Sequence, residues 1–279
     1  EAYGGTVLER SLYRAAETYT ETIELGDGFD YSQVTSGVLP KLYALDNNDL
    51  ILVARNESKL NEVKNEILQL ANVKCDIVVA DLSIKEEWEK VYNYTKDKGY
   101  FVNNLVNNAG FGDRTDFLEM DIDFQIKMTE VNCNSALYLT RMFLPMMVEN
   151  NEGHIINVAS IAGFMPGPFM ATYHATKGYL LLLGEAISYE LRKTKVKLLT
   201  LCPGPFNSEF VSKAHNDYTF KKIKPIEASE VAKYGYKKSL QGKSVAIVGF
   251  KNKLTVFATR FAPRSFVAKT SAKTMKKGA

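Results

Sequence analysis

The sequence predicts an α/β fold in which a doubly wound parallel sheet lies between two layers of helices, as a single domain. Short apolar runs recur along the chain, and their apolar residues are continuous rather than alternating, which is typical of strands buried on both faces. Longer segments with apolar residues at helical spacing separate these runs. Strands and helices that alternate in this way form parallel sheets with right-handed crossovers and helices on both faces.

The regular alternation begins near Lys41 and continues to about residue 250. We therefore divide the chain into an atypical segment at 1–40, an α/β domain at 41–250 and a basic tail at 251–279. Within the domain we expect strands at 50–54, 75–80, 102–106, 154–159, 196–201 and 244–248, and helices at 57–70, 85–96, 121–148, 173–192 and 228–239.

Composition narrows the class of protein. The 279 residues are 46% hydrophobic, enough to fill a large core. No run of about 18 apolar residues is present and no signal-peptide pattern opens the chain, so we expect a cytoplasmic protein with no transmembrane segment. The odd number of cysteines, all in apolar segments, indicates reduced core thiols. The three histidines are scattered, and no metal site is expected.

The basic residues are concentrated at the carboxyl end. Twelve of the 35 Lys and Arg residues follow Glu230, whereas none of the 32 Asp and Glu residues does, so the chain up to Glu230 is net acidic at −9. The tail mixes cations with aromatic residues, a composition that suits an anionic membrane surface. Because Pro263 interrupts it, we expect it to pack against its own domain or a second subunit. It contains no recognisable nucleic-acid-binding module, so no nucleic acid is expected as a partner.

A group of polar side chains follows the strand predicted at 154–159. Ser160 lies just past the strand, and Tyr173 and Lys177 lie near the start of the next helix. Their spacing of four places the phenol and the ammonium on one helix face, about one turn apart. A nearby ammonium favours the phenolate and lowers the pKa of a tyrosine, so Tyr173 is a candidate general acid and base. Ser160 could bind the oxygen whose proton moves.

The pattern Ser-x12-Tyr-x3-Lys, with Tyr-His-Ala-Thr-Lys in its second half, resembles the active site of the short-chain dehydrogenase/reductase family, whose fold is Rossmann-like. The resemblance covers residues 41 to 250. It implies that Asn132, Ser160, Tyr173 and Lys177 form a catalytic tetrad. It also implies that the motif at 107–110 steadies the sheet and lines the adenosine side of a dinucleotide, with Asn108, Ala109 and Gly110 among the cofactor-binding residues.

The resemblance also implies where the rest of the cofactor binds. Asp81 and Leu82 match the pair that contacts the adenine ring. Arg55 follows the second strand of the family fold, where an arginine can pair with a 2′-phosphate, so NADP(H) is favoured over NAD(H). Tyr173 and Lys177 would bind the nicotinamide side of the cofactor. The loop residues that would hold it are Pro203, Gly204, Phe206 and Ser208.

The implied function is an NADP(H)-dependent oxidoreductase that acts on CH–OH donors and interconverts a carbonyl and a secondary alcohol. The apolar loop at 164–170 suggests a hydrophobic substrate, and the helices at 121–148 and 173–192 are those through which the family forms homodimers or homotetramers. The alternative from another class is a catalytically impaired protein of this fold that senses nucleotides or serves as a scaffold.

One motif of the family is missing. Its first strand is followed by a glycine-rich turn that brings the backbone close to the pyrophosphate, and no such turn stands at the expected distance before Leu50. Three explanations are open: a remodelled first turn, a degenerate member that no longer binds nucleotide, or a frame-shifted or misread stretch before residue 41. The break is abrupt, which favours the third, and mass spectrometry of the amino-terminal peptides would separate them.

Overall fold

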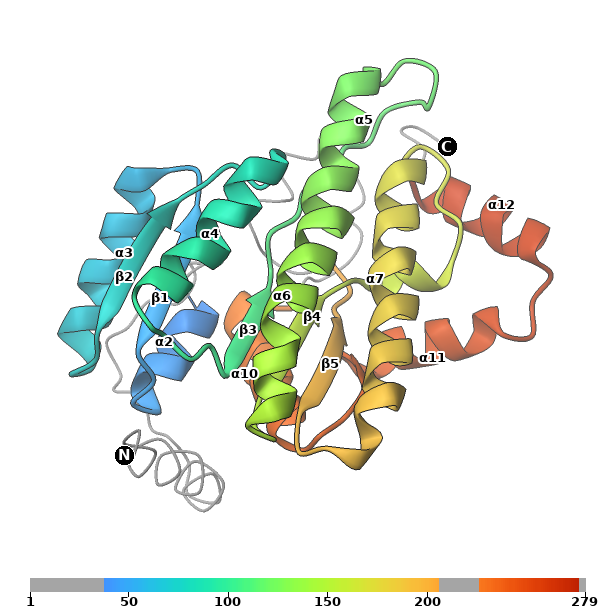
Figure 1. Cartoon of the computed structure of the whole chain (residues 1–279). Helices are drawn as coiled ribbons and strands as arrows, with labels where there is room; N and C mark the ends of the chain where they lie inside the picture. The colour runs from blue at the N-terminus through green and yellow to red at the C-terminus, as the bar shows by residue number, and fades with distance from the viewer. Residues whose placement is uncertain (1–37, 206–225, 276–279) are drawn as a thin grey trace.

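All strand pairs in the described part of the protein are parallel. The computed structural model describes residues 38–205 and 226–275, and Figure 1 shows strands surrounded by helices. One pair joins β1 to β2, and a four-stranded segment has the order β3-β4-β5-β6. The strands are β1 (Leu50–Ala54), β2 (Cys75–Val79), β3 (Asn104–Asn107), β4 (His154–Val158), β5 (Lys197–Cys202) and β6 (Val245–Ile247).

Helices cover both faces of the sheet (Figure 1). One face packs against α4 (Lys85–Asp97), α6 (Ser135–Glu149) and α7 (Ala171–Glu190). The other packs against α2 (Val38–Leu45), α3 (Glu57–Leu70) and α10 (Ala228–Leu240). The result is a Rossmann-like three-layer α/β/α arrangement in a single domain, as the sequence predicts.

The alternation of side chains along a strand explains why these runs are apolar throughout. Ile155 and Ile156 of β4 are both fully buried, but they belong to core clusters on opposite faces of the sheet. Leu198 and Leu199 of the neighbouring β5 repeat the pattern, and the register pairs them with Ile155 and Ile156. A strand with helices on both faces must be apolar at every position.

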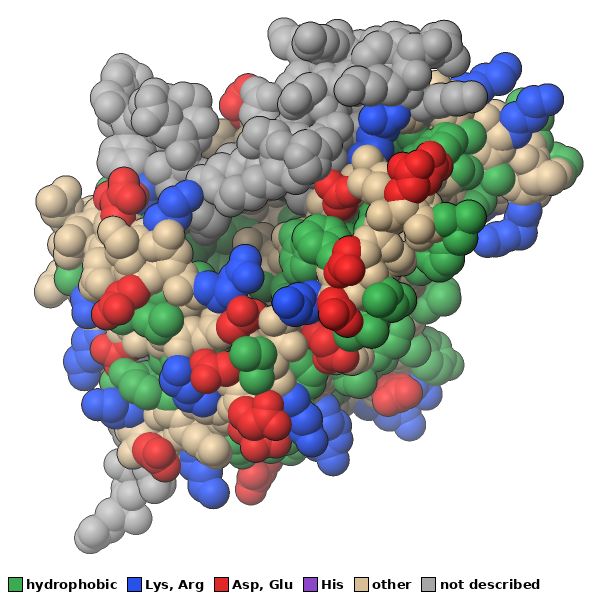
Figure 2. Space-filling model, turned by 90° about the horizontal axis from the view of Figure 1, so that it is seen from above, with side chains coloured by type: hydrophobic (Ala, Val, Ile, Leu, Met, Phe, Trp, Pro, Cys, Tyr) green, Lys and Arg blue, Asp and Glu red, His purple; other side chains and the backbone are tan. Residues whose placement is uncertain are grey.

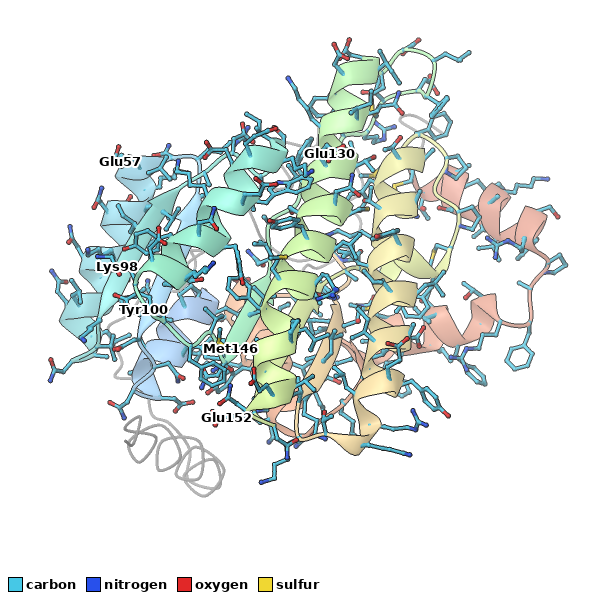
Figure 3. All side chains as sticks on the ribbon, viewed as in Figure 1. Glu57, Lys98, Tyr100, Glu130, Met146 and Glu152 are labelled. Atoms are coloured by element: carbon cyan, nitrogen blue, oxygen red, sulfur yellow. The ribbon has the colours of Figure 1, made fainter. Side chains whose placement is uncertain are left out.

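The predicted strand at 50–54 and helix at 57–70 are confirmed residue for residue, and the remaining predicted strands are confirmed to within two residues. The predicted helix at 121–148 differs. It consists of α5 (Ile122–Thr129), a π-helical segment η2 (Glu130–Asn134) and α6. Figure 3 labels Glu130 at the start of that segment, and Ser135 Oγ donates a hydrogen bond to the Val131 carbonyl at 2.7 Å just after it.

Two helices follow β6 that the sequence patterns did not predict. Gly249, with φ of 86°, precedes α11 (Phe250–Thr259), and Pro263 precedes α12 (Arg264–Met275). Short 3-10 turns complete the described structure at η3 (Ile161–Phe164) and η4 (Leu191–Lys193). No helix among the described residues is long and apolar enough to cross a membrane. The expectations for residues 1–37, including the first strand and turn, lie outside the described residues.

Candidate active site

Ser160 lies between the carboxyl ends of β4 and β5. Its backbone is extended, and its hydroxyl caps η3 by accepting a hydrogen bond from the Ala162 amide at 3.1 Å. The same hydroxyl donates to the Pro203 carbonyl at 3.4 Å, and the Ile161 amide donates to that carbonyl at 3.0 Å. The loop after β4 is therefore fastened to the loop after β5, with the serine hydroxyl at the junction.

Tyr173 and Lys177 lie in the first two turns of α7, as the spacing predicted. The Lys177 Nζ donates a hydrogen bond to the Val158 carbonyl at 2.8 Å and lies 5.8 Å from the centre of the Tyr173 ring. Gly163 of η3 packs directly on this helix, because a Cβ there would lie 2.6 Å from the Lys177 carbonyl oxygen. This close approach brings Ser160 and Tyr173 within hydrogen-bonding reach of each other.

The electrostatics of this pair differ from the sequence expectation. Burial raises the pKa of Tyr173 to about 12, and the hydrogen bond with Ser160 opposes that rise only in part. Burial also lowers the pKa of Lys177 to about 8. The expected lowering of the tyrosine pKa is therefore not found in the protein alone, because loss of solvent is the largest influence on the phenol. Near neutral pH the phenol is protonated and able to donate.

Asn132 is fully buried in the π-helical segment η2. Its side chain pairs with the backbone of Phe111: the amide of Phe111 donates to Oδ1 at 2.9 Å, and Nδ2 donates to the carbonyl at 2.8 Å. Nδ2 also donates to Thr176 Oγ1 at 3.0 Å. Isolated π-helical turns are frequent at functional sites, and this one places Asn132 between α7 and the loop after β3.

The loop after β3 brings the backbone close to these groups. A Cβ on Gly110 would lie 3.1 Å from Asn132 Oδ1 and 3.2 Å from Lys177 Nζ, so any larger residue would crowd both. Asn107 is buried, and its Nδ2 donates to Asn157 Oδ1 at 2.8 Å and to Thr140 Oγ1 at 3.0 Å, joining β3 to β4 and α6. At the start of this loop, Asn108, Ala109 and Gly110 are exposed.

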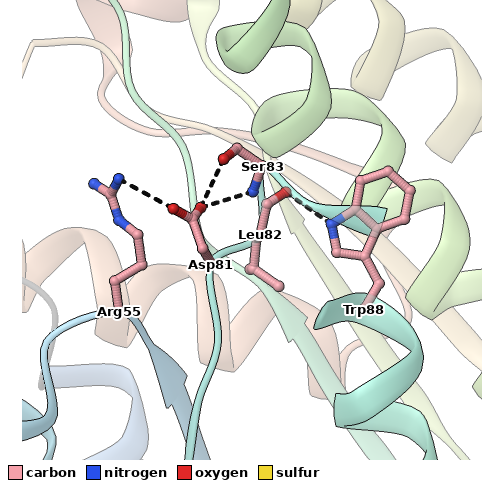
Figure 4. Close-up of polar contacts among 5 residues, drawn as sticks. All are labelled: Arg55, Asp81, Leu82, Ser83 and Trp88. Carbon is pink, nitrogen blue, oxygen red and sulfur yellow. Dashed lines mark hydrogen bonds and ion pairs between the residues drawn. The ribbon is translucent and has the colours of Figure 1, made fainter. Parts of the chain in front are cut away.

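Arg55 and Asp81 follow the neighbouring strands β1 and β2 (Figure 4). The Arg55 guanidinium lies 3.7 Å from the Asp81 carboxylate, yet its side chain is 73% exposed. Asp81 accepts hydrogen bonds from the Ser83 amide at 2.9 Å and the Ser83 hydroxyl at 2.8 Å. These bonds and Arg55 hold the pKa of Asp81 below its usual value despite partial burial. The Leu82 carbonyl accepts from Trp88 Nε1 at 2.8 Å.

The structure thus brings Asn132, Ser160, Tyr173 and Lys177 together, with Gly110 beside them. Arg55, Asp81 and Leu82 lie at the same carboxyl edge but on the β1-β2 segment. Pro203 and Gly204 are buried directly after β5, whereas Phe206 and Ser208 lie outside the described residues. In the described ranges, no cluster of three His, Cys, Asp or Glu side chains could hold a metal ion.

Sequence reasoning missed the residues that hold this site in place. Thr176, next to Lys177, accepts from Asn132 and donates to the Tyr173 carbonyl at 2.8 Å. The Val158 carbonyl holds the lysine ammonium. A backbone carbonyl leaves no signal in a sequence. Thr176 could have been suspected, because it is a small polar residue on an apolar helix one position from a candidate catalytic lysine.

Comparison with known proteins shows the family of this chain. The family model for short chain dehydrogenases matches residues 39–219. The chain belongs to the short-chain dehydrogenase family. An uncharacterised oxidoreductase of Staphylococcus aureus (strain N315) is 30% identical over 185 residues, which cover 66% of this chain and 78% of that protein. The chain is therefore an oxidoreductase of the class that acts on CH–OH groups.

Solved structures of family members share the fold. A structure from work on the stereoselectivity of a 7β-hydroxysteroid dehydrogenase has a TM-score of 0.75 at 20% identity, covering 88% of this chain and 94% of that one. A short-chain dehydrogenase from Sphingobium yanoikuyae, solved with NADPH, has a TM-score of 0.72 at 20% identity, covering 89% and 94%. At these identities the likeness concerns the fold.

Proposed function

We propose that this short-chain dehydrogenase interconverts a carbonyl and a secondary alcohol with NADP(H), and that Tyr173 is the general acid and base. The observation that carries the proposal is the meeting of Ser160, Tyr173 and Lys177 at the end of β4, with Tyr173 and Ser160 in hydrogen-bonding contact. A phenol and a second hydroxyl that converge on one point can bind a single substrate oxygen. No separate acid is then required.

The bound nicotinamide would supply or accept the hydride. In the reductive direction, Ser160 donates a hydrogen bond to the substrate carbonyl oxygen, which orients it, and Tyr173 transfers its proton to that oxygen. The raised pKa of Tyr173 keeps the phenol protonated before the transfer. Lys177, held by the Val158 carbonyl, contributes positive charge beside the phenolate that forms. In the oxidative direction the proton moves the other way.

Features of the carboxyl edge fit a dinucleotide. Gly110 leaves open the space beside Lys177 and Asn132 that a side chain would fill. We assign the nicotinamide ribose to Tyr173 and Lys177, and the nicotinamide to the loop that begins at Pro203 and Gly204. The adenosine side is assigned to Asp81 and Leu82 and to the loop at 108–110.

Arg55 supports the choice of NADP(H). Its side chain is mostly exposed, and at 3.7 Å it forms only a loose ion pair with Asp81. Arg55 can therefore turn to a 2′-phosphate while giving up little interaction energy with Asp81. Asp81 already accepts two hydrogen bonds from Ser83, so its carboxylate remains stabilised when Arg55 moves away. The Sphingobium yanoikuyae relative of the same fold binds NADPH, which agrees with this choice.

We propose a hydrophobic substrate, for example a steroid-like or acyl carbonyl compound. The loop at 164–170 beside Ser160 is composed of Phe, Met, Pro and Gly residues and is only partly buried in most of its length. A relative of the same fold is a hydroxysteroid dehydrogenase. Apolar side chains at the edge of a site favour apolar ligands.

We also propose a homodimer or homotetramer that forms through α6 and α7. Met146, labelled in Figure 3, Leu182 and Tyr189 are 42%, 69% and 67% exposed on these two helices. Large apolar side chains gathered on adjacent helices indicate an interface. Light scattering of the wild type and of Leu182→Glu tests this, and a monomeric wild type would contradict it.

A panel of carbonyl compounds tests the function directly. Consumption of NADPH is followed by absorbance for small aldehydes, acyl ketones and steroid ketones, with NADH run in parallel and Tyr173→Phe as the inactive reference. We expect turnover of an apolar ketone with NADPH preferred. If the purified full-length protein binds neither dinucleotide, the alternative of a catalytically impaired scaffold protein of this fold replaces this proposal.

A further inference from the structure

The helix α11 is fixed to the loops of the candidate site on one side. Val256 is buried, and Asn252 packs so closely on Gly204 that a Cβ there would lie 2.3 Å from Asn252 Nδ2. Asn252 Nδ2 also donates to the Val248 carbonyl at 2.7 Å. The helix contacts η3 as well. At the other end of the tail, Arg114 Nε donates to the Met275 carbonyl, which ties α12 to the loop after Gly110.

The opposite side of α11 is an exposed apolar stripe. It is formed by Phe250, Leu254 and Phe257 and continues with Phe261 in the turn after the helix; the four are 81%, 58%, 54% and 74% exposed. The spacings of four and three residues place the first three on one helical face. The rings of Phe257 and Phe261 contact each other edge to face, with centroids 5.1 Å apart, and Phe266 of α12 is 61% exposed nearby in the sequence.

Cations surround this stripe. The exposed basic residues of the two helices are Lys251, Lys253, Arg260, Arg264, Lys269 and Lys273, and residues 250–275 contain no Asp or Glu. None of these six takes part in an ion pair between described residues. Figure 2 shows blue and green side chains interspersed at its right-hand side, the side on which α11 and α12 lie in Figure 1.

We propose that α11 and α12 form a docking surface for an anionic lipid bilayer, with the apolar stripe inserted among the lipids and the cations on the headgroups. Exposed aromatic and leucine side chains flanked by lysine and arginine are what a helix lying in a membrane interface presents. Anionic headgroups supply the counter-charges that this segment lacks. The protein would bind peripherally, since no described helix is able to span a bilayer.

The charges disfavour a second copy of this chain as the occupant. In a symmetric dimer the same patch lies on both subunits, so the six cations of one would face the six of the other with no acidic residue of the segment between them. Like charges brought together in an interface are costly. Because α11 contacts Gly204 and η3, the candidate site would lie close to the bilayer. This position suits an apolar substrate, an inference that rests on the proposed function.

Vesicle binding tests the proposal. The full chain is mixed with phosphatidylcholine vesicles with and without phosphatidylserine, and the bound fraction is measured by flotation. We expect binding only with phosphatidylserine, falling as salt is raised. Both Phe257→Ser/Phe261→Ser and Lys253→Glu/Arg260→Glu should weaken it about tenfold or more. All four residues are exposed, so thermal melting should be unchanged.

Matched controls lie on the far side of the molecule. Leu68→Ser changes an apolar residue that is 45% exposed on α3, and Lys74→Glu/Lys85→Glu reverses two exposed charges. These variants should bind vesicles like the wild type. The proposal is overturned if the wild type does not bind anionic vesicles. It is also overturned if the variants of α11 and the turn after it, Phe257→Ser/Phe261→Ser and Lys253→Glu/Arg260→Glu, bind as well as the controls. It is also overturned if Phe257→Ser/Phe261→Ser converts an oligomer to a monomer. Vesicle binding needs no cofactor or substrate, so its failure is distinct from failure of the proposed activity.

Discussion

Asn132 donates a hydrogen bond from Nδ2 to Thr176 Oγ1 across 3.0 Å, and Thr176 Oγ1 donates in turn to the Tyr173 carbonyl at 2.8 Å. This relay connects the π-helical segment to the first turns of α7. It runs through fully or nearly fully buried groups, where a lost hydrogen bond is costly. The positions of the candidate acid and of Lys177 therefore depend on a buried threonine between them.

Replacing Thr176 by valine should disturb this relay. The valine keeps the volume but leaves Asn132 Nδ2 with a single partner, so we expect a loss of about 1–3 kcal/mol in the free energy of unfolding and a lower kcat. Urea denaturation and turnover measure the two effects. Thr270→Val on the exposed face of α12 is the control and should change neither. A Thr176→Val protein that matches the wild type in both would show that the relay has no role.

Gly163 and Gly178 form a pair for testing the packing of η3 on α7. A Cβ on Gly163 would lie 2.6 Å from the Lys177 carbonyl oxygen, whereas one on Gly178 would lie 3.4 Å from the Gly163 oxygen, an ordinary contact. We expect Gly163→Ala to cost about 1–3 kcal/mol of stability and to impair turnover by displacing Ser160. Gly178→Ala should be neutral or stabilise the helix by up to about 1 kcal/mol. Equal effects in thermal or urea unfolding would contradict the packing argument.

The buried Lys177 predicts a pH dependence of stability. Its folded pKa of about 8 lies below its ordinary value of 10.5, so between these values the unfolded chain binds more protons than the folded one. The penalty for burying this charge is therefore full below pH 8 and shrinks as pH rises. Lys177→Met should be more stable than the wild type at pH 7, and the difference should narrow towards pH 10. Urea unfolding at several pH values measures it.

The comparison with Lys177→Met is needed because other groups titrate in the same range. Burial raises the pKa of Cys75 and Cys133 to about 11 and that of Tyr173 to about 12, so these groups lower stability as pH rises above their ordinary values of 9 and 10. Removing Lys177 takes away a charge that lowers the pKa of Cys133, so that pKa can only rise further in the variant. Up to pH 10 the buried thiols and phenol therefore stay mostly protonated in both folded proteins, and their contributions cancel in the difference. If the difference in the free energy of unfolding between Lys177→Met and the wild type stays constant from pH 7 to pH 10, the pKa of Lys177 is not lowered by burial.

Arg55 predicts the cofactor preference. If it binds the 2′-phosphate, Arg55→Ala should raise the KM for NADPH roughly ten- to hundredfold and leave that for NADH within a few-fold. Lys74→Ala is the control, since it removes an exposed cation at the opposite end of β2 and should leave both KM values unchanged. Steady-state kinetics with both dinucleotides would refute the assignment if Arg55→Ala raised the two KM values equally.

Much of the fold could be predicted from the sequence because the spacing of apolar residues is maintained along the whole of a strand or helix. The buried strand at 50–54 and the amphipathic helix at 57–70 match the predicted bounds. The break at Glu130–Asn134 could not be predicted, because the apolar spacing continues through it and the π-turn depends on contacts with α7 and the loop at Phe111. The two helices after Gly249 were missed, although Phe250, Leu254 and Phe257 have the helical spacing that could have predicted α11.

The candidate site was predictable in its residues but not in its electrostatics. Serine, tyrosine and lysine at fixed spacing mark the chemistry, and the structure brings them together. The direction of the Tyr173 pKa shift depends on how much solvent the surrounding loops remove, and spacing alone carries no information on that. In the same way, the sequence does not reveal that Arg55 pairs with Asp81, because the two residues follow different strands and lie 26 positions apart in the chain.

The transfer of a proton by Tyr173 is the central claim, and the kcat of Tyr173→Phe tests it most directly. With the best ketone of the panel and saturating NADPH, we predict that kcat falls by about 10²–10⁴-fold. The affinity for NADPH should fall by no more than a few-fold, because Lys177 still binds the ribose, and the melting temperature should stay unchanged. Tyr179→Phe, on the exposed side of the same helix, should keep the wild-type kcat. A Tyr173→Phe protein that turns over within a few-fold of the wild type would contradict the account.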